Sequence, residues 1–238
     1  MRFDDPELVA REYASEERFA ARRAVFSDLV VGEKAEDLAI AALEETHPAR
    51  VLEVGCGLGA FAERVVHELG AEVVAVDVAP RMVELARARG VNALVADAQT
   101  LPFAAEEFDC VVANWVLHHV PDLERGLAEF ERVLEPRGRL VAATFSAEHL
   151  LDLYEWLGDP TVGELEFSSE NGAAPLSRHF AHVERRDAKG TVVFPDRDAL
   201  QAYLSSLIRG RELADRLPDF AGELRARSRQ SIFVADKA

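Results

Sequence analysis

The segment Arg50-Val-Leu-Glu-Val-Gly-Cys-Gly-Leu-Gly-Ala-Phe-Ala-Glu-Arg-Val-Val66 decides the fold, because an apolar run ends in closely spaced glycines and an amphipathic helical pattern follows at once. Glycine backbone between a strand and a helix lets a ligand approach the main chain and face the unpaired N–H groups of the helix start. The glycines stand at positions 55, 57 and 59, which is G-x-G-x-G, whereas the dinucleotide fingerprint is G-x-G-x-x-G. The segment therefore predicts a strand, a ligand-binding loop and a helix.

Composition indicates one large globular domain. The chain has 238 residues, of which 49% are hydrophobic, in short and well-distributed apolar stretches. None of these stretches approaches the roughly 18–20 residues of a membrane span, and the first residues lack a basic-then-apolar leader. The only two cysteines, Cys56 and Cys110, lie in apolar surroundings. We therefore expect a cytoplasmic protein with reduced thiols and no membrane partner.

The charge balance argues against nucleic acid as a partner. The formal net charge is −16, from 43 acidic against 27 basic residues, and the bases form no local stripe. Such a surface repels polyphosphates. The oligomeric state cannot be read from the sequence.

Strand and helix patterns alternate through the middle of the chain. Strands are expected at 51–54, 72–76, 93–96, 109–114 and 140–145, and helices at 58–70, 80–90 and 122–135. This alternation predicts an α/β fold with a doubly wound, mostly parallel sheet and helices on both faces. Residues 5–46 have helical spacing. Beyond residue 146 we expect a helix at 147–157, a loop at 158–177, strands at 183–186 and 191–194, helices at about 198–208 and 210–227, and a last strand at 231–235.

Acidic and polar residues stand at the carboxyl ends of the expected strands, where open α/β sheets bind ligands. These ends are 53–59, Asp77, Asp97 and Asn114. Asp77 can accept hydrogen bonds from both hydroxyls of a ribose, and Asp97 provides an acceptor near the far end of a nucleoside. Alternatively, Asp77 caps a helix or Asp97 forms a turn. The set predicts a site for an adenosine-containing ligand that needs no phosphate.

Six ordered motifs resemble the class I S-adenosylmethionine-dependent methyltransferases, particularly the UbiE-like small-molecule branch. They are Glu53-Val-Gly-Cys-Gly-Leu-Gly59, Val73-Val-Ala-Val-Asp77, Ala96-Asp-Ala-Gln-Thr-Leu-Pro-Phe103, Phe108-Asp-Cys-Val-Val-Ala-Asn114, Val116-Leu-His-His-Val-Pro-Asp122 and Leu134-Glu-Pro-Arg-Gly-Arg-Leu140. The resemblance covers about residues 48–145 and implies a Rossmann-like sheet of seven strands with an antiparallel last strand. It also implies S-adenosyl-L-methionine as the cofactor.

The same resemblance divides the chain and assigns its site residues. It implies one methyltransferase domain over 1–238, with an N-terminal helical lid (1–47), a cofactor-binding core (48–145), a substrate-side insertion (146–230) and the last strand (231–238). The implied cofactor-binding residues are Tyr13 of the lid, Glu53, Gly55, Cys56, Gly57 and Gly59 at the loop, Asp77 for the ribose, Val78, Met82, Asp97 and Ala98 for the adenine, and Asn114 near the cofactor ammonium.

His118 and His119 are the candidate catalytic residues, although adjacent histidines on a turn cannot both point into one site. A neutral imidazole can accept a proton from a nucleophilic oxygen or nitrogen, and His119 is the better candidate by position. One histidine of the pair is expected to be structural. No metal is expected, because His179 and His182 lack companion ligands.

The sequence thus predicts an enzyme that transfers a methyl group to a small-molecule acceptor of unknown identity. The alternatives are a non-catalytic S-adenosylmethionine-binding protein and an NAD(P)-dependent oxidoreductase, against which the glycine spacing and Asp97 argue. An RNA or protein methyltransferase is disfavoured by the acidic composition.

Overall fold

The computed structural model describes residues 16–159, 165–207 and 210–238. The strands are β1 Val30–Gly32, β2 Arg50–Val54, β3 Glu72–Asp77, β4 Asn92–Val95, β5 Phe108–Val112, β6 Leu134–Phe145, β7 His182–Phe194 and β8 Leu224–Asp236. The helices are α2 Glu16–Asp28, α3 Ala35–Glu44, α4 Ala60–Leu69, α5 Pro80–Ala88, the 3₁₀ turn η1 Leu117–His119, α6 Leu123–Val133, α7 Leu151–Trp156, α8 Ala173–Leu176, α9 Arg197–Ser206 and α10 Arg211–Asp215.

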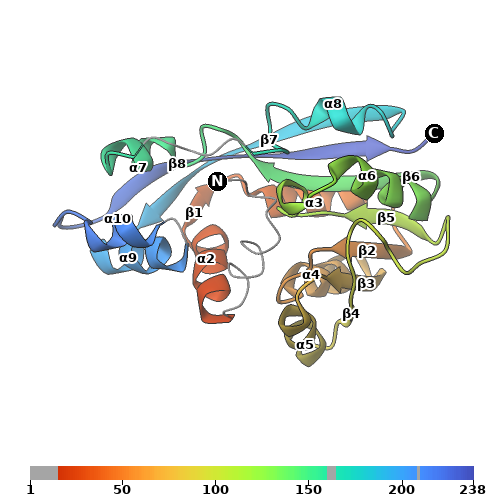
Figure 1. Ribbon diagram of the computed structural model, residues 1–238, viewed down its shortest axis with the longest axis horizontal. Coiled ribbons are helices and arrows are strands. Elements are labelled where there is room, and N and C mark those ends of the chain that lie inside the picture. The colour runs from red at the N-terminus through yellow and green to blue at the C-terminus, as the bar shows by residue number, and fades with distance from the viewer. Residues whose placement is uncertain (1–15, 160–164, 208–209) are drawn as a thin grey trace.

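All eight strands belong to one sheet in the order β1-β7-β8-β6-β5-β2-β3-β4 (Figure 1). The five strands β2 to β6 run parallel, and β8 is antiparallel to both β6 and β7. The predicted α/β, Rossmann-like, mostly parallel sheet with an antiparallel last strand is confirmed. The predicted number of seven strands is wrong, because β1 adds an eighth strand at the edge.

Successive side chains along the strands pack against helices on opposite faces of the sheet. In β2, Val51 packs in the cluster formed with α3 and α4, whereas Leu52 packs in the cluster formed with α6 and α8. This is the two-residue period of a strand that is covered on both faces. Five parallel strands therefore point their carboxyl ends to one edge of the sheet.

The order of the strands reverses direction at β2. The chain passes from β2 to its neighbour β3 on one side, and β5 pairs with β2 on the other. A crevice outside the carboxyl ends of the strands forms at such a switch point. The glycine loop that follows Val54 lies there, and α4 begins directly after Gly59.

The N-terminal region is not entirely helical. Residues Val30–Gly32 form β1, which pairs antiparallel with β7, Gly32 facing Gly190. A β-carbon on Gly32 would lie 3.0 Å from Cα of Gly190. Because neither glycine has a side chain, the two strands can approach each other here. This pairing between distant segments cannot be read from the helical spacing of residues 5–46.

Two further predictions beyond residue 180 are wrong. The strands expected at 183–186 and 191–194 are one continuous strand, β7, since Asp187 to Gly190 pair with Ser231 to Ser228. The helix expected at 210–227 is only the short α10, and β8 begins at Leu224. Buried Ala226 and Ser228 alternate there with exposed Arg225 and Arg227, but arginine is a good helix former and its propensity masked the period of two.

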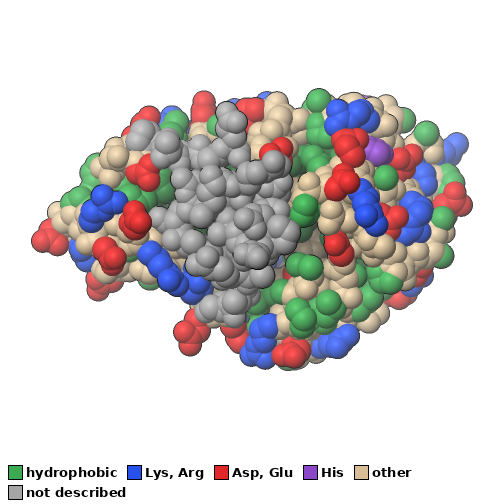
Figure 2. Space-filling view, in the orientation of Figure 1, with side chains coloured by type: hydrophobic (Ala, Val, Ile, Leu, Met, Phe, Trp, Pro, Cys, Tyr) green, Lys and Arg blue, Asp and Glu red, His purple; other side chains and the backbone are tan. Residues whose placement is uncertain are grey.

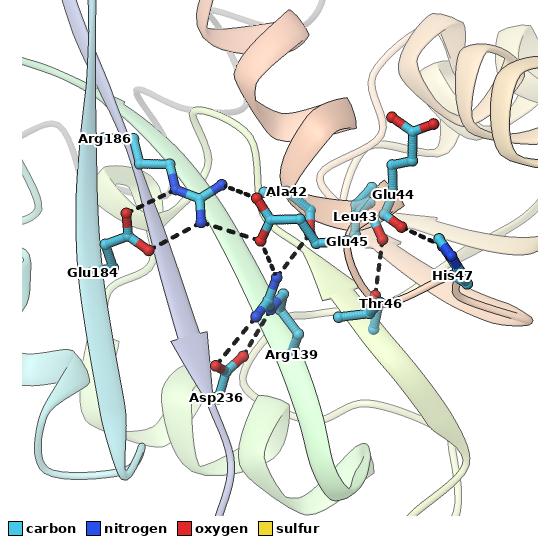
Figure 3. A network of polar contacts seen from close by, with 11 residues as sticks. Ala42, Leu43, Glu44, Glu45, Thr46, His47, Arg139, Glu184, Arg186 and Asp236 are labelled. Carbon is cyan, nitrogen blue, oxygen red and sulfur yellow. Dashed lines mark hydrogen bonds and ion pairs between the residues drawn. The ribbon is translucent and has the colours of Figure 1, made fainter.

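An ion-pair network joins the end of α3 to β6, β7 and β8 (Figure 3). Arg139 Nε and Nη2 donate to the two carboxylate oxygens of Asp236 at 2.7 and 3.3 Å, and Nη1 donates to Glu45. Arg186 bridges Glu45 and Glu184. The hydrogen bond and charge of Arg186 lower the pKa of Glu45. The network is structural and fixes α3 on the sheet.

On the face in Figure 2, Lys and Arg side chains are interspersed with Asp and Glu. Among the described residues, no helix has the length and apolar character needed to span a membrane.

Candidate functional site

The three loop glycines all have positive φ angles: +75° at Gly55, +51° at Gly57 and +75° at Gly59. A β-carbon on Gly55 would lie 2.7 Å from Cγ2 of Val116, and one on Gly59 would lie 2.9 Å from Cβ of Ala86. These two glycines therefore pack the loop against its own scaffold. Gly57 instead faces α2, because a β-carbon on Gly57 would lie 2.7 Å from Cζ of Phe19 in that helix. Gly57 is thus the position where bare backbone faces away from the sheet.

Asp77 ties this loop to the end of β3. Its Oδ2 accepts from the Gly57 N–H at 2.9 Å, and its Oδ1 accepts from the Ala79 N–H at 2.9 Å. Burial raises the pKa of Asp77, and the two backbone N–H groups oppose that rise. Each carboxylate oxygen retains a lone pair for a ligand hydroxyl. A hydrogen bond thus connects the glycine loop to Asp77, and the sequence predicts both as parts of one site.

Glu53 and Asn114 bring polar atoms without partners to the neighbouring strand ends. Burial raises the pKa of Glu53 to about 8, with the charge of Arg23 opposing the rise, so the carboxyl is protonated at neutral pH. Its Oε2, like both Oδ1 and Nδ2 of Asn114, is buried and has no hydrogen-bond partner in the described part of the chain. A buried polar atom left unpaired costs about 1–3 kcal/mol. These atoms are suited to a polar ligand group.

The four residues predicted for the adenine end differ in their availability. Val78 is 60% exposed, whereas Met82 is fully buried. The carboxylate of Asp97 accepts from the backbone and side-chain amides of Gln99, at 2.8 Å and 3.0 Å to Oδ1, so it does form a turn. The backbone N–H of Ala96 donates to the carbonyl of Asp77 at 3.1 Å. That bond places Asp97 and Ala98 beside the end of β3.

Cys56 is a packed residue of the loop. Its side chain is 3% exposed, and burial, with the nearby acids, raises the pKa of its thiol. A buried neutral thiol is a poor nucleophile. Tyr13, the predicted lid residue, lies outside the described residues.

His118 and His119 lie together in η1, with ring centroids 4.1 Å apart. His118 is 5% exposed and its Nδ1 has no partner in the described segments. Burial lowers its pKa well below the usual value, and the charges of His119 and Arg22 add to this effect. His119 is half-buried. One histidine was expected to be structural, but both lie in the same turn, and their positions do not identify which one that is.

Sequence reasoning missed several aromatic residues at this edge. Trp115, Phe145 and His149 surround the ends of β5 and β6, and Phe26 approaches them from α2, 5.8 Å from Phe145 between ring centroids. Trp115 has a φ of +53°, an unfavourable conformation for a bulky side chain. Its position directly after Asn114 was the available signal, whereas nothing local marks the other three.

Part of the chain that carries this site matches a known protein family. Residues 52–142 match the family described as a methyltransferase domain. The demethylmenaquinone methyltransferase of Thermus thermophilus is 40% identical over 126 residues, which cover 50% of this chain and 56% of that protein. The ubiquinone/menaquinone biosynthesis C-methyltransferase UbiE of Haemophilus ducreyi is 37% identical over 161 residues, 60% of this chain and 62% of that protein.

The chain spans about half the length of the curated relatives it matches. Among solved structures, the phosphoethanolamine N-methyltransferase 2 of Haemonchus contortus, in complex with phosphomonomethylethanolamine and S-adenosylhomocysteine, has a TM-score of 0.65 at 18% identity. That match covers 100% of this chain and 60% of the other. It shows that the fold is shared.

Proposed function

We propose that this chain, whose residues 52–142 belong to the class I S-adenosylmethionine-dependent methyltransferases of the UbiE-like branch, transfers a methyl group from S-adenosylmethionine to a small-molecule acceptor. The relatives named as a demethylmenaquinone methyltransferase and a ubiquinone/menaquinone biosynthesis C-methyltransferase support a small-molecule acceptor. The mixed charges of the described surface favour a small acceptor over nucleic acid.

One observation carries the proposal. The Gly57 N–H donates to Asp77 at 2.9 Å, so bare loop backbone and a carboxylate converge at one edge of the sheet. The unpartnered atoms of Glu53 and Asn114 lie at strand ends of the same edge. This donor and acceptor set fits a ligand that carries a ribose and a charged ammonium and has no phosphate.

The residues divide between the parts of the cofactor. Asp77 would accept from the ribose hydroxyls, and Glu53 and Asn114 would face the methionine ammonium. Val78, Met82, Asp97 and Ala98 would hold the adenine. Cys56 would contribute loop backbone, and Gly55 and Gly59 would set the shape of the loop.

S-Adenosylmethionine, when bound, supplies an electrophilic methyl group on a sulfonium centre. The chain then has to hold the acceptor atom in line with that group and exclude water. Orientation of this kind lowers a barrier by roughly 7–11 kcal/mol. α2 covers the loop through Phe19 and provides part of the cover. His119, half-buried in the turn η1 that follows β5, is the proposed proton acceptor for a protic nucleophile.

Calorimetry on the folded chain tests the proposal. We expect binding of S-adenosylmethionine and S-adenosylhomocysteine, and release of S-adenosylhomocysteine in the presence of a mixture of small-molecule acceptors. No binding of either compound at millimolar concentration would reject the proposal. Binding without turnover over a broad acceptor set would support a non-catalytic binding protein, and a fluorescence response to NADH would support an oxidoreductase.

A further inference from the structure

A turn that follows β4 lies beside the end of β3. The Ala96 N–H donates to the carbonyl of Asp77 at 3.1 Å, and the Thr100 N–H closes the turn by donating to the carbonyl of Asp97 at 2.9 Å. Val78, directly after β3, is 60% exposed and offers an apolar surface at the same end of the strand. Asp77 is the proposed acceptor for the ribose hydroxyls. We therefore expect the base of the same nucleoside along this turn.

Gln99 holds the carboxylate of Asp97 in this turn. The backbone N–H of Gln99 donates to Asp97 Oδ1 at 2.8 Å. Its side-chain Nε2 donates to both carboxylate oxygens, at 3.0 Å to Oδ1 and 3.1 Å to Oδ2. An ionised carboxylate offers about four lone pairs to donors. The three bonds from Gln99 thus leave, within the described ranges, one acceptor position on Oδ2 for a donor from a ligand.

The N-terminus of α6 fixes the orientation of the Gln99 amide. Gln99 Oε1 accepts from the N–H of Asp122, the N-cap residue of α6, at 3.0 Å. Arg125 Nε donates to the Gln99 carbonyl at 2.8 Å, and Arg125 Nη2 donates to the Thr100 hydroxyl at 3.1 Å. Because the Asp122 N–H needs an acceptor and the Asp97 carboxylate needs donors, only one orientation of the amide satisfies both. The Nε2 donor is therefore directed at Asp97.

A carboxylate held in this way can distinguish purine bases by the group at carbon 6. The 6-amino group of adenine donates a hydrogen bond to a carboxylate, whereas the 6-oxo group of hypoxanthine or guanine places a second acceptor against it. Two facing acceptors weaken binding, because both lose hydrogen bonds to water and gain no partner. The remaining acceptor position on Asp97 Oδ2 therefore suits a 6-aminopurine.

We infer that Gln99 is a positioning residue, which holds the Asp97 carboxylate as the acceptor for the 6-amino group of the cofactor and so sets the preference of the site for a 6-aminopurine. The inference rests on the proposed function and adds to it the residue that determines base specificity. Gln99 acts through Asp97, and its own amide is held by the N-terminus of α6. The base end of the site thus depends on a contact between the β4 turn and α6.

Calorimetry with two ligands tests the inference. They are S-adenosylhomocysteine and its analogue with hydrogen in place of the 6-amino group. We expect the parent to bind S-adenosylhomocysteine about tenfold more tightly than the analogue, the effect of one hydrogen bond to a charged group. Gln99→Glu keeps an oxygen for the Asp122 N–H and replaces the donor to Asp97 with a second carboxylate oxygen. This variant should bind S-adenosylhomocysteine about tenfold more weakly than the parent does, and the analogue within about twofold of the parent.

Two further variants make the result specific. Gln99→Met removes the same donor without adding a charge and should likewise lose the preference. Thr100→Val removes the hydroxyl that Arg125 contacts in the same turn and should keep the preference of the parent. A parent that binds both ligands equally, or Gln99 variants that weaken both ligands by the same factor, would overturn the inference while the proposed function stands. If the parent does not bind S-adenosylhomocysteine at all, the proposed function itself fails and the inference with it.

Discussion

Phe19 of α2 lies directly over Gly57 of the glycine loop, with its Cζ 2.7 Å from the position that a β-carbon on Gly57 would occupy. The lid helix thus contacts the very backbone that the proposed cofactor must approach. α2 is held from its other side by contacts to α9, including a hydrogen bond from Arg18 to the carbonyl of Ser206 at 3.2 Å. Under the proposed function, the Phe19 ring and the cofactor share the space over Gly57.

A double-mutant cycle measures this contact. Gly57→Ala should lower the free energy of unfolding by about 1–3 kcal/mol, because φ at this residue is +51° and the new methyl meets Phe19. In the Phe19→Ala background the same change should cost about 1 kcal/mol less, since only the backbone strain remains. Urea denaturation of the four proteins gives the coupling. Strict additivity would show that the two residues are not in contact.

Asp77→Ala should affect both stability and cofactor affinity. It leaves the N–H groups of Gly57 and Ala79 without their acceptor, which should cost about 1–3 kcal/mol of unfolding free energy. Affinity for S-adenosylhomocysteine should fall tenfold or more. Asp109→Ala is the matched control, because Asp109 accepts from the N–H groups of Ala49 and Arg50 at the other end of β2. It should lower stability and leave the calorimetric affinity unchanged; equal affinity in both variants would refute the ribose role.

Cofactor binding should release a proton near pH 7. The pKa of Glu53 is raised to about 8 by burial, so the carboxyl is protonated, and a ligand cation placed beside it should lower that pKa below 7. Heats of S-adenosylmethionine binding in phosphate and in Tris should differ by at least about 0.4 of the difference in buffer ionisation enthalpy. Glu53→Gln should abolish this difference. Identical heats for the parent in both buffers would exclude a titrating Glu53 at the ammonium.

The buried histidines should make the fold sensitive to mild acid. The pKa of His149 is lowered from 6.5 to about 3, chiefly by burial, so between these values the unfolded state binds the additional proton. Stability is therefore complete above pH 6.5 and falls as the pH decreases, by about 1.4 kcal/mol per pH unit for this group.

Urea denaturation between pH 7 and pH 5, above the range of most carboxyl titrations, measures that slope. His149→Gln should lose about 1 kcal/mol per pH unit of it, averaged over this range, whereas the exposed change His67→Gln should retain the parent slope. The same slope in both variants would show that His149 takes up its proton in the folded state.

The Arg139 network should stabilise the fold without serving the site. Arg139, 14% exposed, holds Asp236, Glu45 and the Ala42 carbonyl, so Arg139→Met should lower the unfolding free energy by about 1–3 kcal/mol. Arg216→Met removes an exposed pair with Glu212 at 3.7 Å and should change it by less than about 0.5 kcal/mol. Thermal unfolding compares the two, and a similar small shift in both would mean that the network contributes little.

Local sequence patterns are enough to predict the parallel core and the cofactor side of the candidate site. The strand ends, the glycine loop and Asp77 follow from local patterns, and right-handed crossovers bring the ends of consecutive parallel strands to one edge. β1 and the full length of β7 and β8 depend on pairing partners 30 or more residues away in the chain, such as Val30 with Val192. The ring cluster of Phe26, Trp115, Phe145 and His149 likewise depends on long-range packing. Phe26, Phe145 and His149 belong to separate segments and have no shared spacing; packing of α2 against the ends of the strands brings them together.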